Sequence, residues 1–330
     1  MDIAVINALQ INPRASWSDV GPAIGVDAST AGRRWARLQA AGAAWVSCQP
    51  LLSPETASAF IEINAEPGHI LDVARELAGD PQAMTIDVAA GARDLLVTLA
   101  CGDAAQLAEY LVERLARVSR VSRVQSHILV RAYTDASRWR LRALTSPQQR
   151  RIQATLPPAS TEGSVVTVER DLAIAAALSV DGRQSLAELA QAVGTSESTV
   201  RRRLNLLLAS GTLRLRCEMA RELTDWPVSE WFFVRVPSDK IDEAAHSLST
   251  IPEVRAVMSA AGPFNLLVAV WLRGVADGQR LETLIMRKLP HVEIVDRSVV
   301  IRPFKLAGRM LDPRGFAVGV VPLRLTNLRD

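Results

Sequence analysis

The chain has 330 residues, of which 48% are hydrophobic, 22% are charged and only 5% are aromatic. This length suits two domains or a few smaller ones, and the composition is that of a folded globular protein rather than a disordered one. The formal net charge of +3 makes the chain mildly basic and excludes a polycation. Electrostatics alone would therefore give only weak, salt-sensitive binding to nucleic acid.

The sequence gives little sign of a membrane-spanning segment, a secretion signal, a disulfide framework or a metal site. The longest apolar run, residues 264–272, is about half of the roughly 20 residues that cross a bilayer. The N-terminal segment lacks a positively charged stretch, so we expect no signal peptide. Cys48, Cys101 and Cys217 are too few and too dispersed for a disulfide framework or a zinc cluster. We expect a cytoplasmic protein without membrane contact, metal or cofactor.

The main organisational feature is an internal repeat. Residues 2–46 align without a gap on residues 171–215, with many identities, among them Arg14 with Arg183. The match is too dense and collinear to arise by chance. The chain is therefore predicted to contain two tandem units.

The later parts of the two units correspond less closely, through AGARDLLV at 90–97 and AGPFNLLV at 261–268. Each unit is thus predicted to have a front and a rear domain. Between the units we expect a basic, proline-containing linker with some helix before its prolines. The predicted boundaries are 1–50 and 165–217 for the front domains, 55–136 and 228–310 for the rear domains, and 137–164 for the linker.

The first front domain is predicted to contain three helices. Ser16 begins the second helix, Gly25 ends it in a left-handed turn, and Asp27 caps the third helix. The helical spacing of apolar residues in the third helix marks its buried face. That face is formed by Ala31, Trp35 and Leu38.

The first rear domain follows the order strand, helix, strand, strand, helix, strand, which is the ferredoxin-like arrangement. The second rear domain repeats this order from a strand at 230–236 to a strand at 294–301. Such a fold supports many functions, so the order alone does not specify any chemistry. The elements of the first copy are expected at 57–63, 70–77, 84–88, 94–101, from Asp103 through Leu115, and at 121–133.

The second front domain repeats the three-helix pattern. Its first helix stops at Asp181-Gly182, residues 185–188 form a capping box, and Gly194 ends the second helix. Ser196 or Thr195 then caps the third helix. Two short helices joined by a glycine turn are typical of a helix-turn-helix domain. The buried stripe of the third helix is formed by Val200, Leu204, Leu207 and Leu208.

The exposed side of the third helix is the candidate contact surface for DNA. The free amides of a helix N-terminus suit a phosphate, and Arg201 and Arg202 are long enough to reach guanine edges or backbone oxygens. Gly32 stands in the first copy where the second has Arg201, and a glycine has no side chain to read a base. We therefore expect the two front domains to prefer different half-sites. The predicted DNA-binding residues are Ser29, Thr30, Arg33, Arg34, Ser196, Ser198, Thr199, Arg201, Arg202 and Arg203.

The combination of these domains, with a Gly-x-x-Asp turn between the middle strands, resembles the Lrp/AsnC family of bacterial transcription regulators in a fused, double-length form. The resemblance implies an α+β fold with two tandem units, each a (winged) helix-turn-helix domain followed by a ferredoxin-like βαββαβ domain. It also implies binding to double-stranded DNA, an amino acid or related small metabolite as effector, and a homo-oligomer built from intrachain pseudo-dimers. The effector residues implied are Gly91, Asp94, Gly262 and Asn265, although Asn265 lacks the carboxylate of the family pattern.

Two alternatives remain open. The architecture also resembles that of siroheme decarboxylases, in which His127 or His291 would be the candidate catalytic or ligating residue. The second alternative is a metabolite-binding protein whose front domains no longer bind DNA. Nucleophile elbows, phosphate-cradling loops and metal-ligand spacings are not found, and both third helices carry arginines. We therefore predict a regulator and no enzyme.

Overall fold

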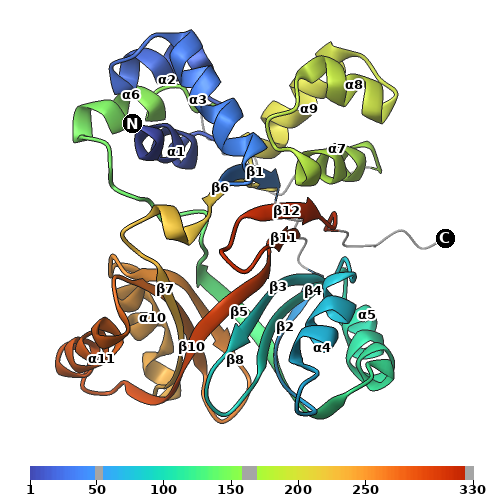
Figure 1. The fold of residues 1–330 in the computed structure, drawn as a ribbon, viewed down its shortest axis with the longest axis vertical. Helices are drawn as coiled ribbons and strands as arrows, with labels where there is room; N and C mark the ends of the chain where they lie inside the picture. The colour runs from blue at the N-terminus through green and yellow to red at the C-terminus, as the bar shows by residue number, and fades with distance from the viewer. Residues whose placement is uncertain (49–54, 158–168, 324–330) are drawn as a thin grey trace. The chain divides into compact units, whose positions relative to one another are not determined.

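The computed structural model describes residues 1–48, 55–157 and 169–323. These residues divide into two compact units, each assembled from separate parts of the chain (Figure 1). The head unit draws on Met1–Pro54, Arg140–Ala220 and Phe316–Arg324, and the body unit on Glu55–Trp139 and Arg221–Gly315. Both front domains thus lie in one unit and both rear domains in the other. No helix in the described ranges is long and apolar enough to span a membrane.

The head unit contains two copies of a three-helix domain, and local sequence signals account for their ends. Ser16 accepts a hydrogen bond from the Asp19 amide, and the predicted capping box between Ser185 and Glu188 is present. Gly25 and Gly194 end the second helices with φ of 80° and 67°. The elements are α1 (Asp2–Ile11), α2 (Trp17–Ile24), α3 (Ala28–Ala40) and β1 (Ala44–Cys48), then α7 (Glu169–Val180), α8 (Leu186–Val193), α9 (Glu197–Ala209) and β6 (Leu215–Met219).

Strands β1 and β6 pair antiparallel and join the two copies. Cys48 and Cys217 occupy equivalent positions of the repeat, and both are buried on these strands. Strand β6 begins only at Leu215, because Leu213 still donates its amide to the Leu207 carbonyl in the turn that ends α9. The C-terminal strand β12 (Ala317–Val320) also belongs to this unit, where the Ala317 amide donates to the Gly42 carbonyl.

Part of the predicted linker is built into the first head. Helix α6 (Ser146–Gln153) packs against α1 and α2 and buries Ile152 completely. Asn7 accepts hydrogen bonds from the amides of Ala143 and Leu144, and Gln10 accepts one from Leu141. These contacts explain why the apolar helix α1 contains buried amide side chains. Residues 158–164 of the predicted linker lie outside the described residues.

The body unit contains the two predicted ferredoxin-like domains. In the first copy, helix α5 (Ala104–Glu109) continues as a π-helical turn at Tyr110–Arg114 and a 3₁₀ turn at Leu115–Arg117. The first copy comprises β2 (Ala57–Ala65), α4 (Ile70–Ala78), β3 (Ala83–Ala89), β4 (Leu95–Cys101), α5 (Ala104–Glu109) and β5 (Val121–Thr134). The second comprises β7 (Val228–Arg235), α10 (Ile241–Ser249), β8 (Val254–Ala260), β9 (Leu266–Leu272), α11 (Val275–Lys288) and β10 (Glu293–Leu306), with β11 (Arg309–Leu311) after it.

Two long strands join these copies into one sheet system. Strand β5 pairs with β2 of its own copy and then with β8 of the other, and β10 pairs with β7 and then with β3. The strand order is β11-β10-β3-β4-β2-β5-β8-β9-β7, and β7 returns to β10. The last strand is predicted to end at 301, but β10 continues to Leu306 because its second half pairs with the first copy.

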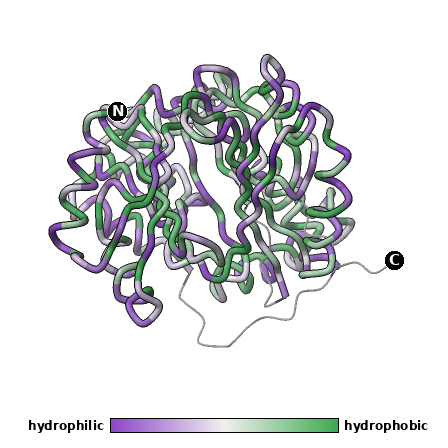
Figure 2. Tube along the Cα trace, turned by 90° about the horizontal axis from the view of Figure 1, so that it is seen from below, coloured by the Kyte–Doolittle hydropathy of each residue, from purple (hydrophilic) through white to green (hydrophobic). Residues whose placement is uncertain are grey.

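Alternating side chains give each strand two faces with different partners. Ala59, Ile61 and Ile63 of β2 pack in the cluster beneath the helices of the first copy. Phe60, on the opposite face, packs against Trp231 in a separate cluster that holds the two copies together. Figure 2 shows the hydrophobic and hydrophilic residues alternating along the chain. The chain thus supplies both halves of its own pseudo-dimer.

Candidate DNA interface and effector sites

Helix α9 presents two arginines at its capped N-terminal end. The Ser196 hydroxyl accepts a hydrogen bond from the Thr199 amide, 3.3 Å away, and fixes the first turn. Val200, Leu204 and Leu207 are buried, so the helix is anchored by its inner face. Ser198, Arg201 and Arg202 lie on the exposed side. This arrangement offers amides, hydroxyls and guanidinium groups on one surface, a combination suited to phosphates and base edges.

Helix α3 carries the corresponding surface of the first head. Asp27 accepts hydrogen bonds from the Ser29 hydroxyl at 2.6 Å and from the Thr30 hydroxyl and amide at 2.7 Å. These bonds hold the pKa of Asp27 well below its usual range. Arg33 is exposed and donates to the Thr30 hydroxyl at 3.3 Å. At the positions equivalent to Arg201 and Arg202, the first head therefore has Gly32 and one exposed arginine, Arg33.

Two other predicted DNA contacts, Arg34 and Arg203, have partners within their own heads. Arg34 forms an ion pair of 2.9 Å with Asp2, and Arg203 forms one with the fully buried Asp171. Each pair ties the third helix of its head to the first. These ion pairs are repeat-equivalent, so they hold both third helices in the same way. A direct contact of Arg34 or Arg203 with DNA stays a prediction.

The difference between the two third helices has a structural cause. A side chain at Gly32 would place its Cβ 3.3 Å from Cδ1 of Trp17, so the indole lies against this position. The second copy has Leu186 in place of Trp17 and the exposed Arg201 in place of Gly32. The two candidate contact surfaces therefore differ in both charge and shape.

The Gly-x-x-Asp turn at 91–94 and its Gly-x-x-Asn counterpart at 262–265 hold strands of the body unit in register. Asp94 accepts a hydrogen bond from the Ala65 amide at 2.9 Å. Asn265 accepts the equivalent bond from the Val236 amide at 2.9 Å and donates back to its carbonyl at 2.7 Å. Gly91 adopts φ of 117°. The Asn265 amide thus makes the same hydrogen bond between strands as the Asp94 carboxylate. It carries no negative charge that could pair with an ammonium group.

A buried polar cluster next to these turns was not predicted from the sequence. Arg93 forms ion pairs with Glu62 and Asp296, and it donates to the Ser298 hydroxyl at 2.7 Å. Glu62 also bonds Nε2 of His127 at 2.8 Å, and both side chains are 6% exposed. The only sequence feature that pointed to this cluster was Arg93, which follows three small residues in the turn AGARD at 90–94. Its partners come from other strands, so sequence spacing did not reveal them.

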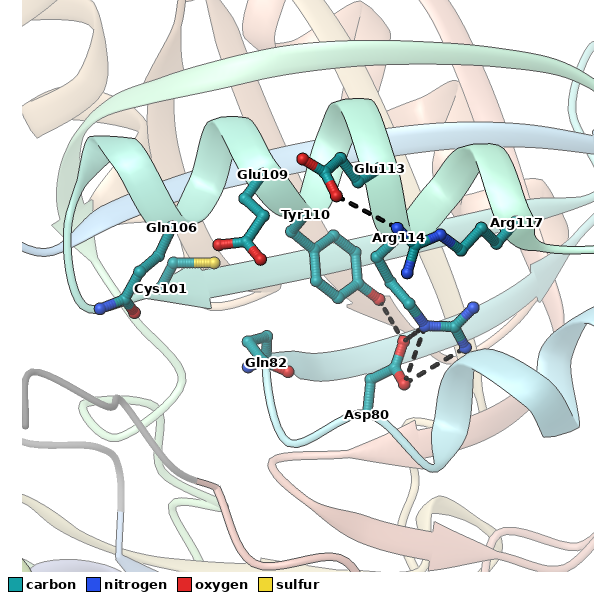
Figure 3. A pocket seen from close by; sticks show the side chains of 9 residues that line it. All are labelled: Asp80, Gln82, Cys101, Gln106, Glu109, Tyr110, Glu113, Arg114 and Arg117. Atoms are coloured by element: carbon teal, nitrogen blue, oxygen red, sulfur yellow. Dashed lines mark hydrogen bonds and ion pairs between the residues drawn. The ribbon is translucent and has the colours of Figure 1, made fainter. Parts of the chain in front are cut away.

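A pocket of about 330 Å³ lies beside the helical segment that follows β4 (Figure 3). Tyr110 and Arg114 point from this segment toward Asp80, which accepts the Tyr110 hydroxyl at 2.6 Å and pairs with Arg114 at 3.1 Å. Burial and the neighbouring carboxylate raise the pKa of Tyr110. The pocket thus contains both charge signs. Its lining residues are Asp80, Gln82, Cys101, Gln106, Glu109, Tyr110, Glu113, Arg114 and Arg117.

A second pocket of about 330 Å³ occupies the repeat-equivalent position in the other copy. Leu281 and Leu284 replace Tyr110 and Glu113 there, and Arg280 replaces Glu109. The second pocket is consequently more apolar than the first. Within the residues that the structure describes, no cluster of histidine, cysteine or carboxylate side chains has the geometry to hold a metal ion.

Comparison with domain families agrees with this architecture. The AsnC-type helix-turn-helix domain matches residues 1–39 and 169–208, and the Lrp/AsnC ligand binding domain matches residues 58–139 and 232–310. Together with the fold, these matches define a tandem protein with two helix-turn-helix domains and two ferredoxin-like ligand-binding domains. The chain belongs to the Lrp/AsnC family, in a fused double-length form.

The similar proteins fall into two groups. An uncharacterized HTH-type transcriptional regulator of Pyrococcus horikoshii is 28% identical over 143 residues, which are 42% of this chain and 87% of the relative. The HTH-type transcriptional regulator LrpA of the same species is 26% identical over 130 residues, or 39% and 90% of the two chains. The crystal structure of the siroheme decarboxylase NirDL matches 96% of this chain and 95% of its own, with a TM-score of 0.60 and 15% identity. At that identity the likeness shows the shared fold alone.

Proposed function

We propose that this chain is a sequence-specific DNA-binding transcriptional regulator of the cytoplasm, modulated by an amino acid or a related small metabolite. The observation that carries the proposal is the pair of exposed arginines, Arg201 and Arg202, at the capped end of α9. Arg33 supplies the corresponding charge on α3. Guanidinium groups at these positions can bind phosphates or the O6 and N7 atoms of guanine.

The relatives support this proposal, because proteins of about one unit in length are named as HTH-type transcriptional regulators. In the fused chain, both heads and both ligand-binding domains are present. Further association of chains into a homo-oligomer is part of the same proposal. The proposal includes no catalytic activity for this chain.

For the effector, we infer a site at the turn from Gly91 to Asp94. A carboxylate can accept about four hydrogen bonds, so Asp94 retains acceptors for an ammonium group while it bonds the Ala65 amide. Gly262 and Asn265 form the equivalent turn without that charge. The first turn is therefore the proposed amino-acid site, and the pocket beside Asp80 is the alternative location.

A tetrapyrrole enzyme is the rival function, since NirDL shares the fold over most of the chain. His127, one candidate ligand, is buried and bonded to Glu62, and its ring packs 4.5 Å from that of Phe264. The Glu62 bond occupies Nε2, so a tetrapyrrole could use that nitrogen only by displacing Glu62. Absorption spectroscopy and product analysis of the purified chain with added siroheme test this function. A Soret band from bound siroheme, together with loss of carboxylate groups from the siroheme, would overturn the regulator proposal.

The principal experiment is selection of DNA from fragmented genomic and randomised duplexes, followed by retardation assays. The Arg201→Ala/Arg202→Ala variant should weaken specific binding strongly, since each lost base contact costs roughly 1–3 kcal/mol. Arg75→Ala/Arg287→Ala is the charge-matched control, because those exposed arginines lie on body-unit helices. If no duplex is retarded at low salt, the proposal fails.

Effector binding is tested by repeating the retardation assay with a panel of amino acids. Asp94→Asn should raise the concentration at which an active amino acid acts, because it removes the carboxylate but keeps the hydrogen bond seen at Asn265. Asp80→Asn tests the pocket of Figure 3 in the same way. If only Asp80→Asn changes the response, the effector site is that pocket and the proposed turn is wrong.

A further inference from the structure

The two heads are held together by one arginine from each. Arg14 donates to the carbonyl oxygens of Gly182 and Gln184, both at 2.8 Å. Arg183 donates to the carbonyl oxygens of Pro13 at 2.5 Å and Ala15 at 3.0 Å. These residues are equivalent in the repeat, since each position of the first head precedes its counterpart by the same interval. The contacts are therefore reciprocal.

Both guanidinium groups are partly buried. Burial lowers the pKa of Arg183 to about 10, and the nearby charge of Arg14 adds to this effect. Burial also lowers the pKa of Arg14, with Asp181 opposing the shift. Hydrogen bonds from charged donors in a partly buried site are stronger than those between neutral groups. The arginines thus fix the turn between the first two helices of one head against the same turn of the other.

The paired strands beside these arginines obey the same symmetry. Val46 pairs with Cys217 and Cys48 pairs with Leu215, so exchanging the two copies maps one pair onto the other. The Gly182 amide donates to the Val46 carbonyl at 2.9 Å. A Cβ at Gly182 would lie 2.4 Å from Cγ1 of Val46, which shows how closely the backbones approach. A local twofold axis therefore relates the heads, and the contact leaves little space for sliding.

The reciprocal arginine contact also reaches the candidate DNA-contact surface of the first head. The Arg183 guanidinium lies 4.2 Å from the centroid of the Trp17 ring, and Trp17 lies against Gly32 of helix α3. In the second head the residue equivalent to Trp17 is Leu186, and Arg201 replaces Gly32. The pair of heads is thus symmetric in its backbone contacts and asymmetric in the side chains it presents.

We propose that the two heads act as one rigid DNA-binding body that recognises a single bipartite operator with a fixed spacer and two unlike half-sites. The half-sites lie in inverted orientation, because the reciprocal contacts relate the heads by a twofold axis. This inference rests on the proposed function. It adds the geometry of the DNA partner and assigns Arg14 and Arg183 as positioning residues that set it.

The test uses an operator selected by the full-length chain from randomised duplexes. One inserted base pair in the spacer should reduce affinity tenfold or more, because it rotates and displaces one half-site. Insertion of about ten base pairs restores the rotational phase but adds about 34 Å of separation. Locked heads should not recover binding on that duplex, whereas independently mobile heads would. Symmetrised operators, with either half-site duplicated, should both bind more weakly than the selected one.

The Arg14→Gln/Arg183→Gln variant should lose affinity for the selected operator and discriminate less against altered spacers. Circular dichroism and thermal unfolding show whether this variant is folded, and the spacer series on the unaltered chain tests the inference without it. Failure to select any operator would refute the proposed function. A selected operator that is symmetric, or that tolerates spacer changes, would refute the rigid pair while leaving DNA binding intact.

Discussion

Lys305 is a buried ammonium group, and this position has a consequence for stability. Its side chain has no exposed surface, and Nζ donates to the carbonyl oxygens of Ala78 at 2.9 Å and Asp80 at 2.8 Å. Burial lowers the pKa of Lys305 from 10.5 to about 8, while the charge of Asp80 opposes the shift. Between these values the unfolded chain binds more protons than the folded chain. The contribution of Lys305 to stability therefore increases as pH rises through this window.

We predict that Lys305→Met removes this pH dependence. Relative to the variant, the unaltered chain should gain about 2 kcal/mol of unfolding free energy from neutral pH to about pH 10. Urea unfolding at a series of pH values measures the difference, and Lys288→Met is the control because its side chain is exposed. A difference that stays constant across the series would contradict the assignment.

Gly262 and Gly91 occupy equivalent turns but have different surroundings. Both have positive φ, at 156° and 117°, so an alanine is strained at either position. A Cβ at Gly262 would also lie 2.8 Å from Nδ1 of His127, whereas the nearest atom to a Cβ at Gly91 is 3.8 Å away. We predict that Gly262→Ala costs about 1 kcal/mol more unfolding free energy than Gly91→Ala. Equal losses of unfolding free energy for the two variants would show that the His127 ring moves aside without an energetic penalty.

At the level of elements, Arg93 joins the two ferredoxin-like domains. It lies on the turn between β3 and β4, and it contacts Glu62 of β2 as well as Ser298 and Asp296 of β10. Its guanidinium also lies 4.1 Å from the ring centroid of Phe233 on β7. The repeat-equivalent residue is Phe264, so the contact between the copies is ionic on one side and aromatic on the other.

We predict that Arg93→Met destabilises the body unit by about 3 kcal/mol, because it leaves the Glu62 carboxylate without its buried cation. Glu62→Met should also be destabilising. The double variant should lose about 1–3 kcal/mol less than the two single losses added together. A double-mutant cycle in urea measures this coupling. Strictly additive losses would mean that Arg93 and Glu62 do not stabilise each other.

The elements that sequence could predict are those with local signals. Ser16, Gly25 and Glu188 act within one turn of their own helix, and the structure confirms the helix ends they indicate. The second half of β10 was missed because its partner is β3, far away in the chain. Arg14 and Arg183 were visible as identical residues of the repeat, but their acceptors are backbone carbonyls of the other copy. Because every residue has a backbone carbonyl, the sequence does not show which of them accept these hydrogen bonds.

At the scale of the whole molecule, both associations between repeat copies are internal to one chain. The heads are joined by β1 and β6, and the rear domains by the pairings of β5 with β8 and of β10 with β3. In a dimer of separate subunits, unfolding is coupled to dissociation, and its midpoint depends on concentration. The fused chain replaces this bimolecular step by loop closure, whose cost grows only slowly with length.

We therefore predict that the midpoint of urea unfolding stays constant over about a hundredfold range of chain concentration. Tryptophan fluorescence is a suitable readout, since Trp231 lies 4.8 Å from Phe60 of the other copy, measured between ring centroids. Sedimentation over the same range separates this result from the proposed association of chains into larger oligomers. Such oligomers would also release partners on unfolding and raise the midpoint with concentration, so the prediction applies to the range in which sedimentation shows single chains. Within that range, a midpoint that falls on dilution would contradict the pairing of the copies inside one chain.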